Sequence, residues 1–86
     1  MAHAKITVYG TEWCSDCHRA KLVLERHQAA YDWIDVDNDA DSREYVLQVN
    51  GGRRIVPTIV FEDGSILAEP SDAELAIKLG IAGAGS

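Results

Sequence analysis

Cys14 and Cys17 are the only cysteines of this 86-residue chain, and two residues separate them. They follow a short β-favouring run, residues 5–9, and precede a segment whose apolar residues recur at three- and four-residue spacing. The pattern places the pair at the first turn of a helix, where side chains three positions apart lie on one face. Two thiols so placed can close into a disulfide and reopen while the fold stays still, which indicates thiol–disulfide chemistry.

Cys14 stands at the expected start of this helix, where backbone N–H groups lack partners and the helix dipole is positive. Both features favour the thiolate, which is the nucleophile in disulfide exchange. We therefore expect Cys14 to attack and Cys17 to complete a redox-active pair. Asp16 in the same turn suits the dipole, but its carboxylate opposes ionisation of a neighbouring thiol, so we expect Asp16→Tyr to favour the thiolate.

The size and charge of the chain narrow the classes of function. Its length predicts one small domain, residues 1–86, and 47% apolar residues indicate a folded chain. The net charge of −6 argues against nucleic acid and anionic membranes as partners, and no apolar run has the length of a signal peptide or a bilayer span. We expect a soluble, cytoplasmic monomer; in that reducing compartment a lone cysteine pair is more often catalytic or metal-binding than structural.

The periodicities predict an α/β chain with the order β-α-β-α-β-β-α. The expected elements are a strand at 5–9, a helix at 15–29, a strand at 31–36, a helix at 42–49, a hairpin of strands at 57–61 and 65–68, and a last helix opened by the capping box 71–74. The residues expected on the inner face of the first helix are Ala20, Val23, Leu24 and His27. The first two strands should be parallel, and residues 80–86 should fray.

Two motifs and this order resemble the glutaredoxin branch of the thioredoxin fold over nearly the whole chain, which implies a four-stranded mixed sheet flanked by helices. The motifs are Trp13-Cys14-x-x-Cys17 and Val56-Pro57-Thr58. Residues 49–58, residues 61–65 and Pro70-Ser71 are further similar to the mycoredoxins of actinobacteria. The resemblance implies an enzyme that reduces mixed disulfides between proteins and a low-molecular-weight thiol, with mycothiol rather than glutathione as co-substrate and no bound cofactor.

The resemblance also implies roles for residues beside the cysteines. Pro57 would be cis and lie next to the pair, leaving the backbone of Val56 free to bind an extended substrate. Trp13 would shield Cys14 and offer a flat surface to the substrate, or simply pack in its loop. Arg54 would pair with a carboxylate or sugar hydroxyl of the bound thiol, or remain solvated, and Arg53 is expected to be solvated.

The start of the last helix is where glutaredoxins hold a carboxylate of glutathione with backbone N–H groups. Ser71 and Asp72 occupy that place, although Ser71 also serves as a plain helix cap. Glu69-Pro70 replaces the double glycine common there. Because proline lacks an N–H donor and both residues add bulk, this change favours a different thiol.

Three other patterns resemble haem, zinc and calcium sites, but each lacks residues that such a site needs. Cys14 to His18 matches a haem c attachment motif, but Met1 is the only methionine and no export signal is expected. A zinc site would need two more ligands, and the histidines form no second cluster. The acidic run 35–41 lacks the glycine and the final glutamate of a calcium loop, so we expect a solvated turn and no metal site.

Two alternative functions remain open from the sequence. The chain could be an electron donor to ribonucleotide reductase that thioredoxin reductase recycles directly. It could also be a glutaredoxin module that holds an iron–sulfur cluster through Cys14 and an external thiol. The second cysteine makes the cluster-binding alternative the weaker of the two.

Overall fold

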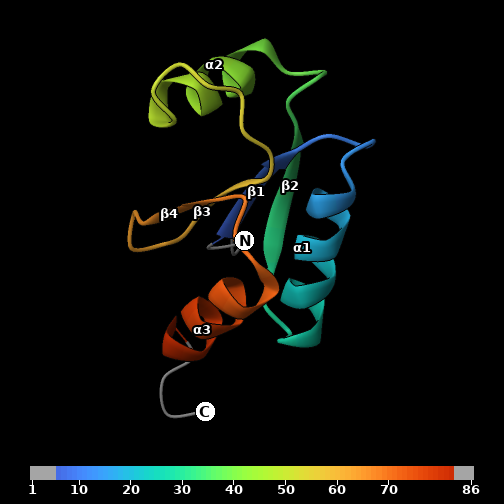
Figure 1. Cartoon of the computed structure of the whole chain (residues 1–86), viewed down its shortest axis with the longest axis vertical. Coiled ribbons are helices and arrows are strands. Elements are labelled where there is room, and N and C mark those ends of the chain that lie inside the picture. Colours follow the sequence, from blue (N-terminus) through green and yellow to red (C-terminus); the bar gives the residue numbers. More distant parts are fainter. Residues whose placement is uncertain (1–5, 83–86) are drawn as a thin grey trace, which may run out of the picture.

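The computed structural model describes residues 6–82 and contains seven elements in the predicted order (Figure 1). The strands are β1 (Ile6–Gly10), β2 (Tyr31–Asp35), β3 (Thr58–Val60) and β4 (Ile66–Ala68), and the helices are α1 (Ser15–Arg26), α2 (Ala40–Val49) and α3 (Asp72–Ala82). Lys5, predicted to begin the first strand, lies outside the described residues.

The four strands form one mixed sheet in the order β2-β1-β3-β4. β1 pairs parallel with β2, so that Val8 lies opposite Trp33. β3 runs antiparallel to β1 and places Ile59 opposite Val8, and β4 pairs antiparallel with β3. These pairings confirm the predicted parallel first pair, the hairpin and the mixed sheet of the thioredoxin-like fold.

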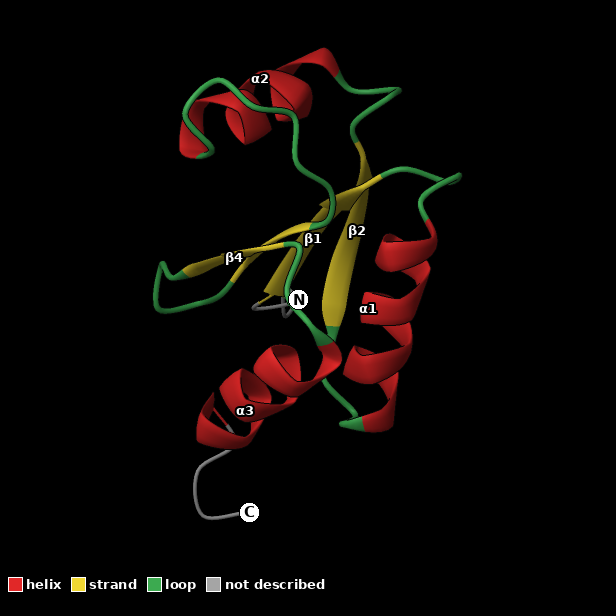
Figure 2. Ribbon diagram, in the orientation of Figure 1, coloured by secondary structure: helices red, strands yellow, loops and turns green. Residues whose placement is uncertain are grey.

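The core lies between one face of the sheet and the helices α1 and α3, which lie next to each other in Figure 2. Its buried members are Ile6, Val8, Ala20, Val23, Leu24, Ile59, Phe61, Leu75 and Leu79. Burying each large aliphatic side chain contributes roughly 1.5–3 kcal/mol. Tyr9 alternates with Val8 and faces the other way, where its ring lies 5.2 Å from that of Tyr45 in α2. This packing fixes the end of β1 from both faces.

α1 and α2 differ from the prediction at their ends. α1 stops at Arg26 rather than at residue 29, because Gln28 adopts a left-handed backbone with φ of 56°. The expectation that His27 lies on the inner face was wrong: it caps the finished helix and is exposed. α2 begins two residues earlier than predicted, because the Asp39 carboxylate accepts a hydrogen bond from the N–H of Ser42, 3.2 Å away.

α3 begins at the predicted capping box and ends later than predicted. The N–H of Glu74 donates to the Ser71 hydroxyl over 3.0 Å, and the N–H of Ser71 donates to the Glu74 carboxylate over 2.8 Å. The helix continues through Gly80 to Ala82. A single glycine costs a helix only about 1 kcal/mol relative to alanine. Residues 83–86 of the predicted tail lie outside the described residues.

None of the three described helices combines the length and the apolar character needed to cross a membrane.

Gly10 ends β1 against two side chains that leave no room for a larger residue. A Cβ at this position would lie 2.6 Å from Cη2 of Trp33 and 2.7 Å from Sγ of Cys17. We expect Gly10→Ala to lower the free energy of unfolding by about 1–3 kcal/mol, measured by urea denaturation. In a Trp33→Leu background the same change should cost less, because one of the two overlaps is gone. Strictly additive costs would contradict this account.

Candidate active site

Cys14 is itself the N-cap of α1. Its backbone is extended, with φ of −87° and ψ of 111°, and its Sγ accepts a hydrogen bond from the N–H of Cys17 over 3.1 Å. A side-chain oxygen usually fills this position, because it satisfies an N–H that the helix leaves unpaired. Here the sulfur does so at the positive end of the helix dipole, which is an arrangement that favours the thiolate.

Cys17 lies one turn later and is completely buried, whereas Cys14 is 8% exposed. Both are free thiols in this structure. Burial raises the pKa of the Cys17 thiol to about 12, and its hydrogen bond with Cys14 and the nearby Asp16 charge act in the same direction. Cys17 is therefore protonated at neutral pH, and the two sulfurs are chemically distinct.

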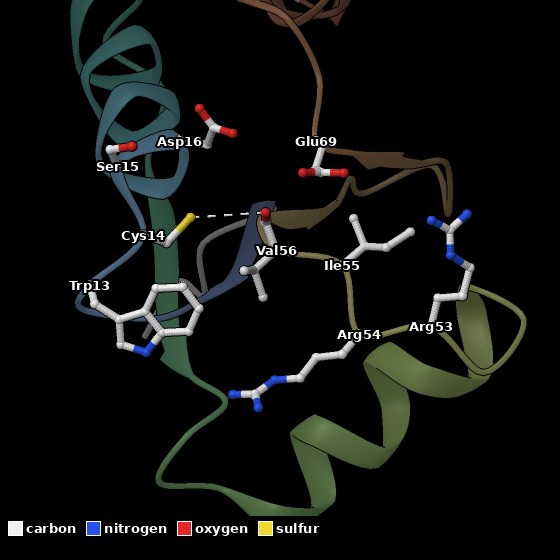
Figure 3. Close-up of a pocket in the computed structure, with 9 residues that line it drawn as sticks. All are labelled: Trp13, Cys14, Ser15, Asp16, Arg53, Arg54, Ile55, Val56 and Glu69. Carbon is white, nitrogen blue, oxygen red and sulfur yellow. Dashed lines mark hydrogen bonds between the residues drawn. The ribbon is translucent and has the colours of Figure 1, made fainter.

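The loop before β3 lies against Cys14. The Val56–Pro57 peptide bond is cis, as the resemblance implied. The Cys14 thiol lies 3.9 Å from the carbonyl oxygen of Val56, a contact drawn dashed in Figure 3. Within the described part of the chain the N–H of Val56 has no hydrogen-bond partner. Pro57 is buried beneath this contact, and its carbonyl accepts a hydrogen bond from the N–H of Glu69 over 2.8 Å. A backbone donor is thus left available beside the thiol.

A cleft of about 480 Å³ opens in front of Cys14 (Figure 3). It is lined by Trp13, Cys14, Ser15, Asp16, Arg53, Arg54, Ile55, Val56 and Glu69. Four of the predicted site residues are in this lining: Trp13, Cys14, Arg54 and Val56. The other four are not: Cys17 and Pro57 are buried behind it, while Ser71 and Asp72 belong to the start of α3.

Trp13 and Arg54 are joined by a residue that the sequence analysis missed. The indole N–H of Trp13 donates to one oxygen of Asp37 over 2.8 Å, and the Arg54 guanidinium pairs with the other oxygen. These two contacts hold the pKa of Asp37 below its usual range, with the indole bond as the larger cause. Asp37 had been placed in a solvated acidic turn, and no sequence spacing links it to partners 24 and 17 positions away. Trp13 itself remains 70% exposed.

Arg19 neutralises the carboxylate that lies between the two cysteines, Asp16. Its guanidinium lies 3.0 Å from Asp16 and 2.9 Å from Asp72, which ties the first turn of α1 to the first turn of α3. The ion pair uses the side chain of Asp72, whereas the expected contact with the bound thiol is through backbone N–H groups. Ser71 is likewise used in the helix cap. Neither side chain is directed to the cleft by these contacts.

The side chain of His18, the residue after Cys17, also makes a hydrogen bond within the protein. The imidazole Nε2 of His18 lies 2.6 Å from the carbonyl oxygen of Glu12, to which it donates a hydrogen bond. Among residues 6–82, no group of three or more His, Cys, Asp or Glu side chains is arranged to hold a metal ion.

Comparison with known proteins gives consistent matches. The sequence model of the family described as Glutaredoxin matches residues 6–66. A glutaredoxin-like protein of Mycobacterium tuberculosis is 44% identical over 79 residues, covering 92% of this chain and 94% of the relative. Mycoredoxin 1 of Corynebacterium glutamicum is 40% identical over 76 residues, covering 88% and 94%. The crystal structure of the thioredoxin-like protein BC3987 superposes with a TM-score of 0.75 at 32% identity, covering 87% of this chain and 99% of that one.

The two thiols should differ sharply in reactivity. We expect iodoacetamide at pH 7 to alkylate Cys14 at least about tenfold faster than Cys17, because Cys17 is buried and protonated. Peptide mass mapping after timed quenching measures both rates, and denatured protein serves as the control in which both sites react. Equal rates in the native protein would contradict the assignment of separate roles.

Asp16 and Arg19 should affect Cys14 in opposite directions. Asp16→Asn removes a negative charge near the sulfur and should speed alkylation of Cys14 at neutral pH by about two- to fivefold. Arg19→Gln leaves Asp16 and Asp72 unpaired and should slow it by a similar factor. Arg26→Gln, at the far end of α1, makes the same change in net charge and should leave the rate unchanged. Shifts of the same sign in Asp16→Asn and Arg19→Gln would refute the electrostatic explanation.

Proposed function

The chain belongs to the glutaredoxin family and is a thiol–disulfide oxidoreductase, and from this we propose that it reduces mixed disulfides between protein cysteines and mycothiol, with Cys14 as the nucleophile. The observation that carries the proposal is the position of the Cys14 sulfur. It caps α1, contacts the carbonyl of Val56 and lines a cleft large enough for the small-thiol half of such a disulfide.

In the first step the Cys14 thiolate attacks the sulfur that belongs to the small thiol. A disulfide forms between Cys14 and that thiol, the original disulfide breaks, and the protein cysteine leaves as a thiolate that takes up a proton. The N–H of Cys17 and the α1 dipole stabilise the Cys14 thiolate before attack and after its release. No other residue has to supply charge for this exchange.

In the second step a thiolate resolves the Cys14 adduct. A free molecule of the small thiol attacks the adduct, which regenerates the Cys14 thiolate and releases the symmetric disulfide of the small thiol. Cys17 could instead attack Cys14, but it is completely buried, and burial is the largest cause that raises the pKa of its thiol. We therefore assign resolution to the external thiol, which makes Cys17 dispensable for this reaction.

The choice of mycothiol is supported by similarity and by the lining of the cleft. Mycoredoxin 1 is among the most similar relatives, and the segments around residues 49–58 and 61–65 resemble mycoredoxins. The exposed face of Trp13 offers a flat surface on which the apolar side of a sugar ring can lie. Arg54, fixed by Asp37, presents its remaining N–H donors along the same wall of the cleft.

The backbone of Val56 is the part of the cleft that suits the protein half of the substrate. The unpaired N–H and the carbonyl of Val56 can pair with an extended segment on either side of the target cysteine. Such main-chain recognition accepts many sequences, which suits an enzyme that acts on several proteins. We place the protein in the cytoplasm, because the reaction needs a compartment that keeps small thiols reduced. We propose that it acts as a monomer.

Turnover of defined mixed disulfides tests the proposal. One protein substrate carrying either mycothiol or glutathione on a single cysteine is offered to the wild type, Cys14→Ser and Cys17→Ser, with the matching free thiol as reductant. We expect turnover with mycothiol that is lost in Cys14→Ser by at least about a hundredfold and is retained within about threefold in Cys17→Ser. Turnover with glutathione should be slower.

Other outcomes would point elsewhere. Loss of activity in both cysteine variants would show that Cys17 resolves the intermediate. Inactivity with both thiols, together with reduction by thioredoxin reductase and NADPH, would replace the proposal with a dedicated electron donor. Circular dichroism of each variant serves as the folding control.

A further inference from the structure

Glu69 is held rigidly at the edge of the cleft. Its backbone is left-handed, with φ of 49°, a conformation that favours glycine and costs other residues roughly 1 kcal/mol or more. Its N–H is bonded to the carbonyl of Pro57 over 2.8 Å, and the buried Pro70 and the capping box of α3 follow directly. The backbone of Glu69 is therefore fixed on both sides, and its side chain is exposed in the cleft lining.

The charge of Glu69 is not neutralised by the protein. Four charged side chains line the cleft: Asp16, Arg53, Arg54 and Glu69. Asp16 is paired with Arg19, and Arg54 is paired with Asp37. Within residues 6–82, Arg53 and Glu69 have no ionic partner. These two are the charged groups of the cleft that remain for a ligand.

The two unpaired charges lie at different places. Figure 3 shows Glu69 next to Val56, on the same edge of the cleft as Asp16, and Arg53 at the end beyond Ile55. In Figure 3 the Cys14 sulfur points toward Val56, on the side where Asp16 and Glu69 lie, so we place the first atoms of a thiol bound to Cys14 near these two carboxylates. Negative charge on those atoms is therefore repelled by the carboxylates, and positive charge is attracted. Arg53 lies too far along the cleft to offset this effect.

We propose that Glu69 sets the charge selectivity of the thiol site, so that Cys14 accepts thiols that are neutral or cationic next to the sulfur and discriminates against those with a carboxylate there. The inference rests on the proposed function and goes further, because it assigns selectivity to one side chain. Glu69 acts through its charge and takes no part in bond making.

Three small symmetric disulfides isolate charge from all other features of a thiol. Cystamine is cationic, bis(2-hydroxyethyl) disulfide is neutral and 3,3′-dithiodipropionate is anionic, and all three have short chains of similar size. In each reaction the Cys14 thiolate forms a disulfide with one half of the reagent and the other half leaves as thiolate. Loss of reduced full-length protein, followed by acid quench and intact mass, gives the rate. The ratio of variant to wild type cancels the intrinsic reactivity of each reagent.

Glu69→Gln keeps the size and polarity of the side chain and removes its charge. We expect this variant to react about three- to tenfold faster with the anionic disulfide, slower by a similar factor with the cationic one, and within about twofold with the neutral one. Potassium chloride at about 1 M should compress these differences in the wild type, because it shortens the Debye length to about 3 Å. The matched control is Glu44→Gln, an exposed glutamate of α2 outside the cleft lining, which should leave all three rates unchanged.

The outcomes separate this inference from the function on which it rests. The role of Glu69 would be overturned if its replacement by Gln changed the three rates equally. It would also be overturned if Glu44→Gln raised the anionic rate and lowered the cationic rate in the same way. Neither result would affect the assignment of Cys14 as the nucleophile. Reagents that oxidise the wild type and Cys14→Ser alike would overturn the proposed function as well. The proposal is supported if Glu69→Gln reacts faster with the anionic disulfide and slower with the cationic one, and Glu44→Gln shows neither change.

Discussion

The hydrogen bond from the N–H of Cys17 to the sulfur of Cys14 is the contact on which the rest of the site depends. It makes a thiol, in place of the usual hydroxyl or carboxylate, the cap of α1. β1 ends at Gly10, four positions before Cys14, and the second cysteine of the pair packs against this strand end. Gly10 allows this close approach, because any side chain there would meet Trp33 and Cys17.

The cis-proline loop supplies the second half of the arrangement. Val56 presents its carbonyl to Cys14 and leaves its N–H unpaired, while the Pro57 carbonyl accepts the N–H of Glu69 beside it. One loop therefore places a substrate-binding backbone beside the sulfur of Cys14 and anchors the backbone of Glu69 at the cleft. The pairing of Asp37 with Trp13 and Arg54 orders these two side chains of the cleft wall before a thiol binds.

Local signals in the sequence predicted most of the fold and the two cysteines. Neighbouring residues are enough to predict the cysteine pair, the capping box 71–74 and the hairpin. The cis-proline was predicted from the resemblance to glutaredoxins. The contacts that were missed join distant segments: Asp37 meets Trp13 and Arg54, and Arg19 meets Asp72. Side-chain pairing of this kind depends on the packed sheet and helices.

The identity of the group left on Cys14 after attack tests the central claim most directly. Cys17→Ser protein is mixed with one equivalent of a protein carrying a mycothiol mixed disulfide, without free thiol, and its intact mass and modified peptide are determined after acid quench. The account predicts that the mass of mycothiol is retained on Cys14 and that the protein cysteine is released reduced. A disulfide between Cys14 and the substrate protein, or an unmodified Cys14 while the substrate is reduced, would contradict it.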